Sequence, residues 1–289
     1  MKKILILSFV FTACLPVGRI SPYPDLQHIH ILIGNGDSRI SGAYRLDVCK
    51  PSDLLPFPMV QIMCNDTYLY ENLQMGVNNC IDHAGFPNSR SNISLSEKRG
   101  GWELGVAKRV TNHPEIYKLP LRYVSTGQGF SSANDWANYP VDCNPYCHEL
   151  PEISMFWTKF KKPAERAIQL LNGKSYDITV AISAGTNDAI GGATSTSYKA
   201  NMLKHIGHIR QYFGSNTVII IVKLQPFSTL ADKYNNVIME ICKESTNIRY
   251  VDVAGLPRLD VFHENYVGQD SVANRILRIA ESYWNISVK

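Results

Sequence analysis

A serine in the setting of a nucleophile lies near the start of the sequence. The apolar run His30-Ile31-Leu32-Ile33 predicts a buried strand, and it breaks into Gly34-Asn35-Gly36-Asp37 directly before Ser38. Ser38 is therefore expected just past the carboxyl end of a strand, which is the edge of a parallel sheet where ligands bind. Serine is also a common helix cap, so this stretch alone leaves a catalytic and a capping role open.

The chemistry that a serine could do depends on a second segment near the other end of the chain. A serine hydroxyl is a weak nucleophile near neutral pH, and it needs a base whose tautomer is fixed by a partner. His263 and Asp260, three residues apart on a predicted turn, can supply both. The pattern predicts acyl transfer with Ser38 as nucleophile, His263 as base and Asp260 as the carboxylate that orients the imidazole. Taken singly, Asp260 could instead cap a turn and His263 could be a surface residue.

The elements that must position these residues alternate between strands and helices, which is typical of a parallel α/β sheet. Because polar blocks follow the first, second, third and fifth predicted strands, we expect all of them at one edge of the sheet. We predict a three-layer α/β/α sandwich with a five-stranded parallel sheet, as a single domain over residues 20–289. Residues 47–98 lack sustained periodicity and are expected to be a Cys-rich insertion beside the site. The five strands are predicted at residues 30–33, 121–125, 177–183, 217–222 and 248–253.

Four blocks together carry a family resemblance: Gly36-Asp37-Ser38, Gly127-Gln128-Gly129-Phe130-Ser131, Gly185-Thr186-Asn187-Asp188 and Asp260-x-x-His263. From about residue 30 to the C-terminus, apart from the insertion, the chain resembles the SGNH (GDSL-type) hydrolases. The resemblance implies a flavodoxin-like fold and a serine esterase that needs no cofactor and no metal. It also implies an oxyanion hole formed by the backbone N–H groups of Ser38 and Gly129 and the side-chain amide of Asn187.

One branch of this superfamily contains the sialate O-acetylesterases and acetyl xylan esterases. The segment Gly129 to Trp136 is similar to the corresponding segment of that branch, which implies an O-acetylated glycan as substrate and Trp136 and Asp37 as substrate-binding residues. The blocks Gly-Asp-Ser-Arg and Ala-Gly-Thr-Asn-Asp follow the broader GDSL pattern instead. A lipase or thioesterase acting on lipid or acyl esters is therefore an alternative, and a catalytically silent glycan-binding module is another.

The N-terminus predicts export. Met1-Lys2-Lys3 and the apolar residues 4–11 resemble a secretory signal peptide, which we place at residues 1–19, so the protein is expected to be secreted or extracytoplasmic. The apolar run is too short to span a membrane. A lipid anchor at Cys14 is the alternative reading of the same segment.

The cysteines and the net charge bear on three further features: disulfides, a zinc site and nucleic-acid binding. Besides Cys14 there are six cysteines, which would allow up to three disulfides in an exported chain. A zinc site built from Cys143, Cys147 and His148 is a weaker alternative, because it lacks a second pair of ligands. The formal charge of +4 falls to about +1 without Lys2, Lys3 and Arg19, so no basic footprint for nucleic acid is expected.

Overall fold

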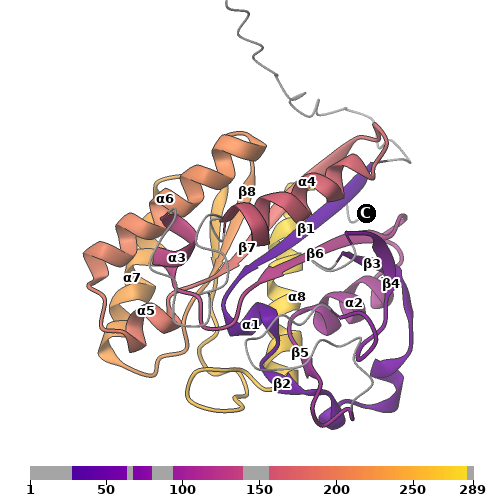
Figure 1. Ribbon diagram of the computed structural model, residues 1–289, viewed down its shortest axis with the longest axis horizontal. Coiled ribbons are helices and arrows are strands. Elements are labelled where there is room, and N and C mark those ends of the chain that lie inside the picture. The colour runs from indigo at the N-terminus through magenta and orange to yellow at the C-terminus, as the bar shows by residue number, and fades with distance from the viewer. Residues whose placement is uncertain (1–27, 64–67, 80–93, 139–155, 285–289) are drawn as a thin grey trace, which may run out of the picture.

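A mostly parallel sheet forms the middle of the protein, and helices cover both of its faces (Figure 1). These features come from a computed structural model that describes residues 28–63, 68–79, 94–138 and 156–284. The strand order in the main sheet is β4-β3-β6-β1-β7-β8-β9, and only β4 is antiparallel to its neighbour. The strands are β1 (Ile29–Gly36), β3 (Phe57–Met63), β4 (Tyr70–Leu73), β6 (Leu121–Gly127), β7 (Tyr176–Ser183), β8 (Val218–Val222) and β9 (Ile248–Val251), with β2 (Tyr44–Arg45) and β5 (Arg99–Gly100) pairing separately.

Two buried clusters hold the three layers together. One lies between the sheet and helices α2 and α8, and the other lies between the sheet and helices α4, α6 and α7. The apolar runs of the central strands contribute to both clusters because alternate side chains of a strand point to opposite faces. The helices are α1 (Ser38–Ser41), α2 (Glu103–Asn112), α3 (Ala133–Ala137), α4 (Lys162–Gln169), α5 (Thr186–Ile190), α6 (Ser195–Phe213), α7 (Thr229–Lys243) and α8 (Tyr266–Tyr283), together with short 3₁₀ turns at Leu46–Val48 and Pro51–Leu54 and a π-helical turn at Phe156–Lys161.

The predicted fold class is confirmed, but the predicted strand number is wrong. All five predicted strands are present as β1, β6, β7, β8 and β9, in one parallel array. The sheet has seven strands because β3 and β4 come from the segment 47–98. That segment therefore extends the sheet on the β6 side in addition to carrying irregular structure.

Prolines concealed β3 in the sequence. Proline cannot donate a ladder hydrogen bond and is confined to strand starts, edges and bulges. Pro58 lies near the start of β3, where the pairing with β4 shifts register between Phe57 and Gln61. The pairing with β6 begins only at Val60. Pro58 is thus accommodated outside the regular ladder, and Gln61 to Met63 pair on both sides.

The expectation of up to three disulfides also needs correction. Cys49 and Cys242 are free thiols. Three disulfides would need all six cysteines, so three disulfides are excluded. Cys49 packs against the cluster on the α2 and α8 side, whereas Cys242, on α7, packs against the opposite one. Burial raises the pKa of the Cys49 thiol to about 12 and that of Cys242 to about 11, which keeps both protonated and unreactive near neutral pH. Cys64, Cys80, Cys143, Cys147 and His148 lie outside the described residues.

The signal peptide at residues 1–19 and the lipid anchor at Cys14 also lie outside the described residues, so export stays a prediction. Within the described ranges, none of the helices has the length and apolar character needed to cross a bilayer.

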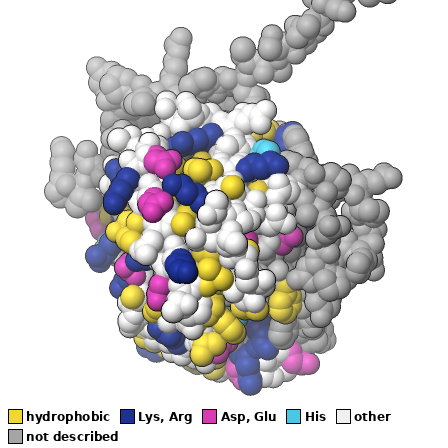
Figure 2. Space-filling model, turned by 90° about the vertical axis from the view of Figure 1, so that its left-hand side faces the viewer, with side chains coloured by type: hydrophobic (Ala, Val, Ile, Leu, Met, Phe, Trp, Pro, Cys, Tyr) yellow, Lys and Arg dark blue, Asp and Glu magenta, His cyan; other side chains and the backbone are white. Residues whose placement is uncertain are grey.

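On the face over α6 and α7, basic and acidic side chains are interspersed and neither sign gathers into one large patch (Figure 2).

Candidate active site

The turn that follows β1 presents Ser38 at the carboxyl edge of the sheet. Gly36 ends β1 with φ +136°, and a Cβ there would lie only 1.7 Å from the carbonyl oxygen of Ser183 on β7. Only glycine permits this close approach of the two strands. Asp37 then caps α1 by accepting a hydrogen bond from the backbone N–H of Arg39. Ser38 is the first residue of α1 and is largely buried.

A short turn before α8 brings the imidazole to this serine. His263 Nε2 lies 2.6 Å from Ser38 Oγ, although 225 residues separate the two. The turn is closed by the backbone N–H groups of Leu259 and Asp260, which both donate to the carbonyl oxygen of His263. This distance is within the hydrogen-bonding range that a general base requires.

Asp260 orients the imidazole from the other side. His263 Nδ1 lies 3.0 Å from Asp260 Oδ1 and 2.9 Å from Oδ2, and the backbone N–H groups of Phe262 and His263 donate to Oδ1 at 2.7 and 2.8 Å. Partial burial by itself would raise the pKa of Asp260, but these hydrogen bonds outweigh it and hold the pKa below its ordinary value. The carboxylate is therefore ionised near neutral pH and fixes the tautomer in which Nε2 can accept the serine proton.

The two loops predicted to complete an oxyanion hole begin at the strands on either side of β1. Gly36 pairs with Gly127 on β6 and with Ser183 on β7, so the segments carrying Gly129 and Asn187 begin level with the turn that carries Ser38. Asn187 Nδ2 donates to the carbonyl oxygen of Ser131 at 2.8 Å, which ties the two loops together. An amide carries two N–H groups, so this bond still permits donation to an oxyanion.

Comparison with known proteins identifies solved structures with a similar fold. No family model matches the chain, and no curated protein matches it by sequence. Solved structures do match. A protein from Arabidopsis thaliana aligns with a TM-score of 0.63 and 17% identity, covering 88% of this chain and 98% of the other.

Two further matches are esterases. A carbohydrate acetylesterase from Xanthomonas citri aligns with a TM-score of 0.52 and 9% identity, and a family two carbohydrate esterase from Clostridium thermocellum with 0.50 and 12%. They cover 85% and 89% of this chain, which spans 54% and 65% of the length of those two proteins. The chain therefore has the same α/β fold as these esterases. At these identities the likeness concerns the fold alone.

Two sequence-predicted substrate residues are not at the surface of the protein. Trp136 is 0% exposed, and its Nε1 donates to Ser131 Oγ at 3.0 Å. Asp37 is also 0% exposed, and besides capping α1 it accepts a hydrogen bond from Ser183 Oγ at 3.1 Å. Both predictions need correction, because a wholly buried side chain cannot contact a substrate: Trp136 and Asp37 hold the loops that surround Ser38.

Sequence reasoning missed a buried ion pair behind the candidate site. Arg39 follows the serine and Glu264 follows the histidine, and both are almost completely buried, with Arg39 Nε 3.5 Å from Glu264 Oε2. Arg39 Nη1 donates to the carbonyl oxygen of Lys223 at 2.7 Å, and Gln225 Nε2 donates to Glu264 Oε1 at 2.7 Å. The pair therefore joins the two segments that carry the nucleophile and the base. The sequence does carry a signal for this pair: a basic residue directly follows the predicted nucleophile, and an acidic residue directly follows the predicted base.

Proposed function

We propose that this protein is a serine esterase that removes O-acetyl groups from a carbohydrate. The observation that carries the proposal is the continuous hydrogen-bonded series from Ser38 Oγ through the His263 imidazole to the Asp260 carboxylate, at the strand edge where SGNH hydrolases and other open α/β sheets bind ligands. A structural role alone does not explain why an exposed carboxylate, a half-buried imidazole and a serine converge in this order.

The geometry supports a two-step mechanism. His263 Nε2 takes the proton from Ser38 as Oγ attacks the ester carbonyl, and Asp260 stabilises the imidazolium that forms. Backbone N–H groups at Ser38 and Gly129 and the Asn187 amide are the proposed donors to the oxyanion. His263 then returns the proton to the leaving alkoxide, which leaves an acyl group on Ser38. Water, activated by the same imidazole, releases this acyl group as a carboxylic acid.

The acetylated-carbohydrate substrate is supported by two structural neighbours with TM-scores of at least 0.50, which are a carbohydrate acetylesterase and a carbohydrate esterase. It is supported independently by the similarity of residues 129–136 to the acetylesterase branch. Trp136 is not a sugar-stacking residue because it is buried, so any aromatic surface for sugar must come from other residues.

A second candidate function is hydrolysis of longer acyl esters. Leu259 and Val261, which flank Asp260, are 54% and 57% exposed, and Ile190 at the end of α5 is 58% exposed. Exposed apolar side chains on the loops that carry the site are suited to contact with an acyl chain. This observation favours the lipid or acyl-ester alternative over a silent binding module.

The decisive experiment measures acyl-chain preference with the purified protein. We expect p-nitrophenyl acetate to be hydrolysed at least tenfold faster than the octanoate, and acetate to be released from an acetylated sialoside, xylan or other polysaccharide. Ser38→Ala should lower kcat by about 10³-fold or more, while the thermal unfolding temperature stays close to that of the wild type. A preference for octanoate would favour the second candidate. Wild-type turnover by the Ser38→Ala variant would rule out a serine mechanism.

A further inference from the structure

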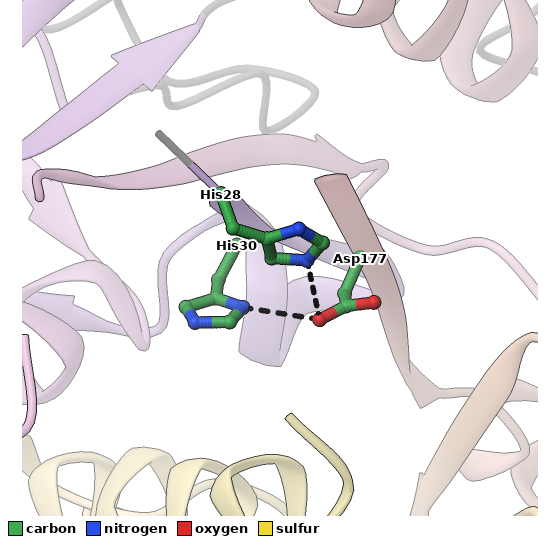
Figure 3. Close-up of side chains that lie close together, drawn as sticks. All are labelled: His28, His30 and Asp177. Carbon is green, nitrogen blue, oxygen red and sulfur yellow. Dashed lines mark ion pairs between the residues drawn. The ribbon is translucent and has the colours of Figure 1, made fainter. Parts of the chain in front are cut away.

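Three side chains of metal-ligand type meet at the opposite end of the sheet from Ser38. His28 and His30, at the start of β1, converge on Asp177 at the start of β7 (Figure 3). Asp177 Oδ2 lies 2.8 Å from His28 Nε2 and 3.4 Å from His30 Nδ1. The proposed esterase mechanism uses none of the three.

The strand register explains why they meet. His30 and Asp177 are direct partners in the parallel pairing of β1 with β7. His28 is two residues before His30, so its side chain points to the same face of the sheet. The candidate ligand atoms of all three residues lie within 4.8 Å of one another. A regular element of the fold therefore holds them, in contrast to ligands scattered over flexible surface side chains.

Neighbouring groups fix both imidazole rings. His28 Nδ1 lies 3.0 Å from Ser175 Oγ, which leaves Nε2 facing Asp177. The ring of His30 stacks on Trp284 at the end of α8, with ring centroids 4.5 Å apart and planes 10° from parallel. In metal sites, a histidine ligand commonly forms a hydrogen bond through its second ring nitrogen, as His28 does with Ser175, and this bond sets the tautomer and orientation of the ring.

We propose that His28 Nε2, His30 Nδ1 and an Asp177 carboxylate oxygen bind one divalent transition-metal cation of the Zn²⁺ class. Two imidazoles and one carboxylate suit zinc and its neighbours in the first transition series, whereas magnesium and calcium prefer all-oxygen sites. Bonds of about 2.0–2.2 Å to a tetrahedral ion place its ligand atoms about 3.3 Å apart, close to the 2.8 and 3.4 Å separations present here. The three side chains are 19 to 41% exposed, so water can reach the remaining coordination positions.

The position of the site assigns it a structural task. An ion bound there would clamp the beginning of β1 to β7, at the point where the described chain enters the sheet (Figure 1). The triad lies beyond the other end of the same strands, so metal binding is expected to raise stability without changing ester hydrolysis.

The test is calorimetric titration of the purified full-length protein, freed of metal by chelator, with ZnCl₂. We expect the wild type to bind one more equivalent of Zn²⁺ than Asp177→Asn, or to bind that equivalent at least tenfold more tightly. His28→Gln should show the same loss. His113→Gln is the matched control. His113 forms an exposed pair with Glu115 at 2.9 Å, and among the described residues no third metal-ligating side chain joins this pair. This substitution should leave the titration unchanged.

Two further measurements keep the result interpretable. Zn²⁺ should raise the unfolding temperature of the wild type and of His113→Gln more than that of Asp177→Asn, whereas Mg²⁺ should raise none of them. Circular dichroism in chelator establishes that each variant is folded. His28→Gln is the milder of the two substitutions, because it leaves the stack of His30 on Trp284 in place. If Asp177→Asn and His28→Gln bind Zn²⁺ with the stoichiometry and affinity of the wild type, the cluster is an ordinary histidine–aspartate ion pair and the proposal fails.

Discussion

At the scale of single residues, the two oxygens of Asp260 explain why the charge of this side chain matters more than its shape. Oδ1 accepts hydrogen bonds from the backbone N–H groups of Phe262 and His263, and both oxygens face Nδ1 of the imidazole. Asparagine could still accept the backbone hydrogen bonds through its single oxygen. Its amide NH₂ would then face His263 Nδ1 and favour the tautomer with the proton on Nε2, which cannot take the proton of Ser38.

Asp260→Asn is therefore expected to lower kcat for p-nitrophenyl acetate by about 10³- to 10⁴-fold and to leave the fold intact. Stopped-flow or steady-state kinetics measures the loss of kcat, and a thermal melt shows whether the fold is intact. Asp252→Asn is a suitable control, because Asp252 is also a half-exposed carboxylate near the carboxyl edge of the sheet but pairs with Lys223. An Asp260→Asn variant with wild-type kcat would show that the imidazole does not depend on this carboxylate.

The sequence allowed Ser38, His263 and Asp260 to be predicted as partners because the chemistry of each demands the others. It could not exclude Asp37 and Trp136 as substrate residues, since polar and aromatic side chains near a nucleophile look the same whether they face solvent or the interior. Their burial depends on how Ser183 and Ser131 approach them in the folded state. The pair of Arg39 and Glu264 escaped notice for a similar reason, because complete burial of both charges arises only from tertiary packing.

At the scale of elements, this buried ion pair links α1 to the turn before α8. Glu264→Gln would leave the Arg39 guanidinium buried without its counter-charge, which costs about 3–5 kcal/mol in comparable cases. We expect a loss of this size in the free energy of unfolding from urea denaturation, together with a lower kcat. The double variant Arg39→Met/Glu264→Met should be less destabilised than the sum of the losses measured for Arg39→Met and Glu264→Met singly. Additive losses would mean that the two side chains act independently.

Two helix glycines provide a matched test of how closely α2 packs on α8. A Cβ at Gly105 in α2 would lie 2.6 Å from Asp270 Cα and 2.7 Å from Ala273 Cβ, both on α8, whereas a Cβ at Gly207 in α6 would have no neighbour within 4 Å. Alanine is favoured over glycine in a helix by about 1 kcal/mol. Gly207→Ala should therefore raise the free energy of unfolding by about that amount. Gly105→Ala should lower it by about 1–3 kcal/mol, because the helices must move apart. Stabilisation by both substitutions would show that α2 and α8 are not in tight contact.

At the scale of the whole molecule, the predictable part of the fold is the parallel array. Strands β1, β7 and β8 are nearly continuous buried apolar runs, and such runs identify central strands in the sequence. Strand β4 escaped prediction because it is short and polar and pairs only at one edge, and β3 because Pro58 interrupts its pattern. Sequence periodicity reports burial on both faces well, but it reports poorly on edge strands whose pairing is set by neighbours distant in the chain.

Asp188 couples the stability of the whole molecule to pH. It follows Asn187, is 4% exposed, and accepts a hydrogen bond from the backbone N–H of Ala133 at 2.7 Å. Burial raises the pKa of Asp188 to about 6, with help from the negative charge of Asp135 and against the backbone hydrogen bond. Between about pH 4 and pH 6 the folded protein therefore keeps a proton on Asp188 that the unfolded chain has already lost. Since the folded state binds more protons in this window, stability falls as the pH rises, and the fall ends near pH 6.

The displacement from 3.8 to about 6 corresponds to about 3 kcal/mol. Asp188→Asn removes this titration, so the free energy of unfolding of the wild type minus that of the variant should drop by about 3 kcal/mol between pH 3.5 and pH 7. Asp252→Asn is a control of opposite sign: hydrogen bonds and Lys223 hold the pKa of Asp252 below its ordinary value despite its partial burial, so its contribution grows as the pH rises from acid. Urea denaturation at half-unit pH steps measures both differences. A wild-type-minus-Asp188→Asn difference that is flat with pH would mean that Asp188 titrates alike in the folded and unfolded states, and that the loop carrying Asn187 is more open to water than the structure shows.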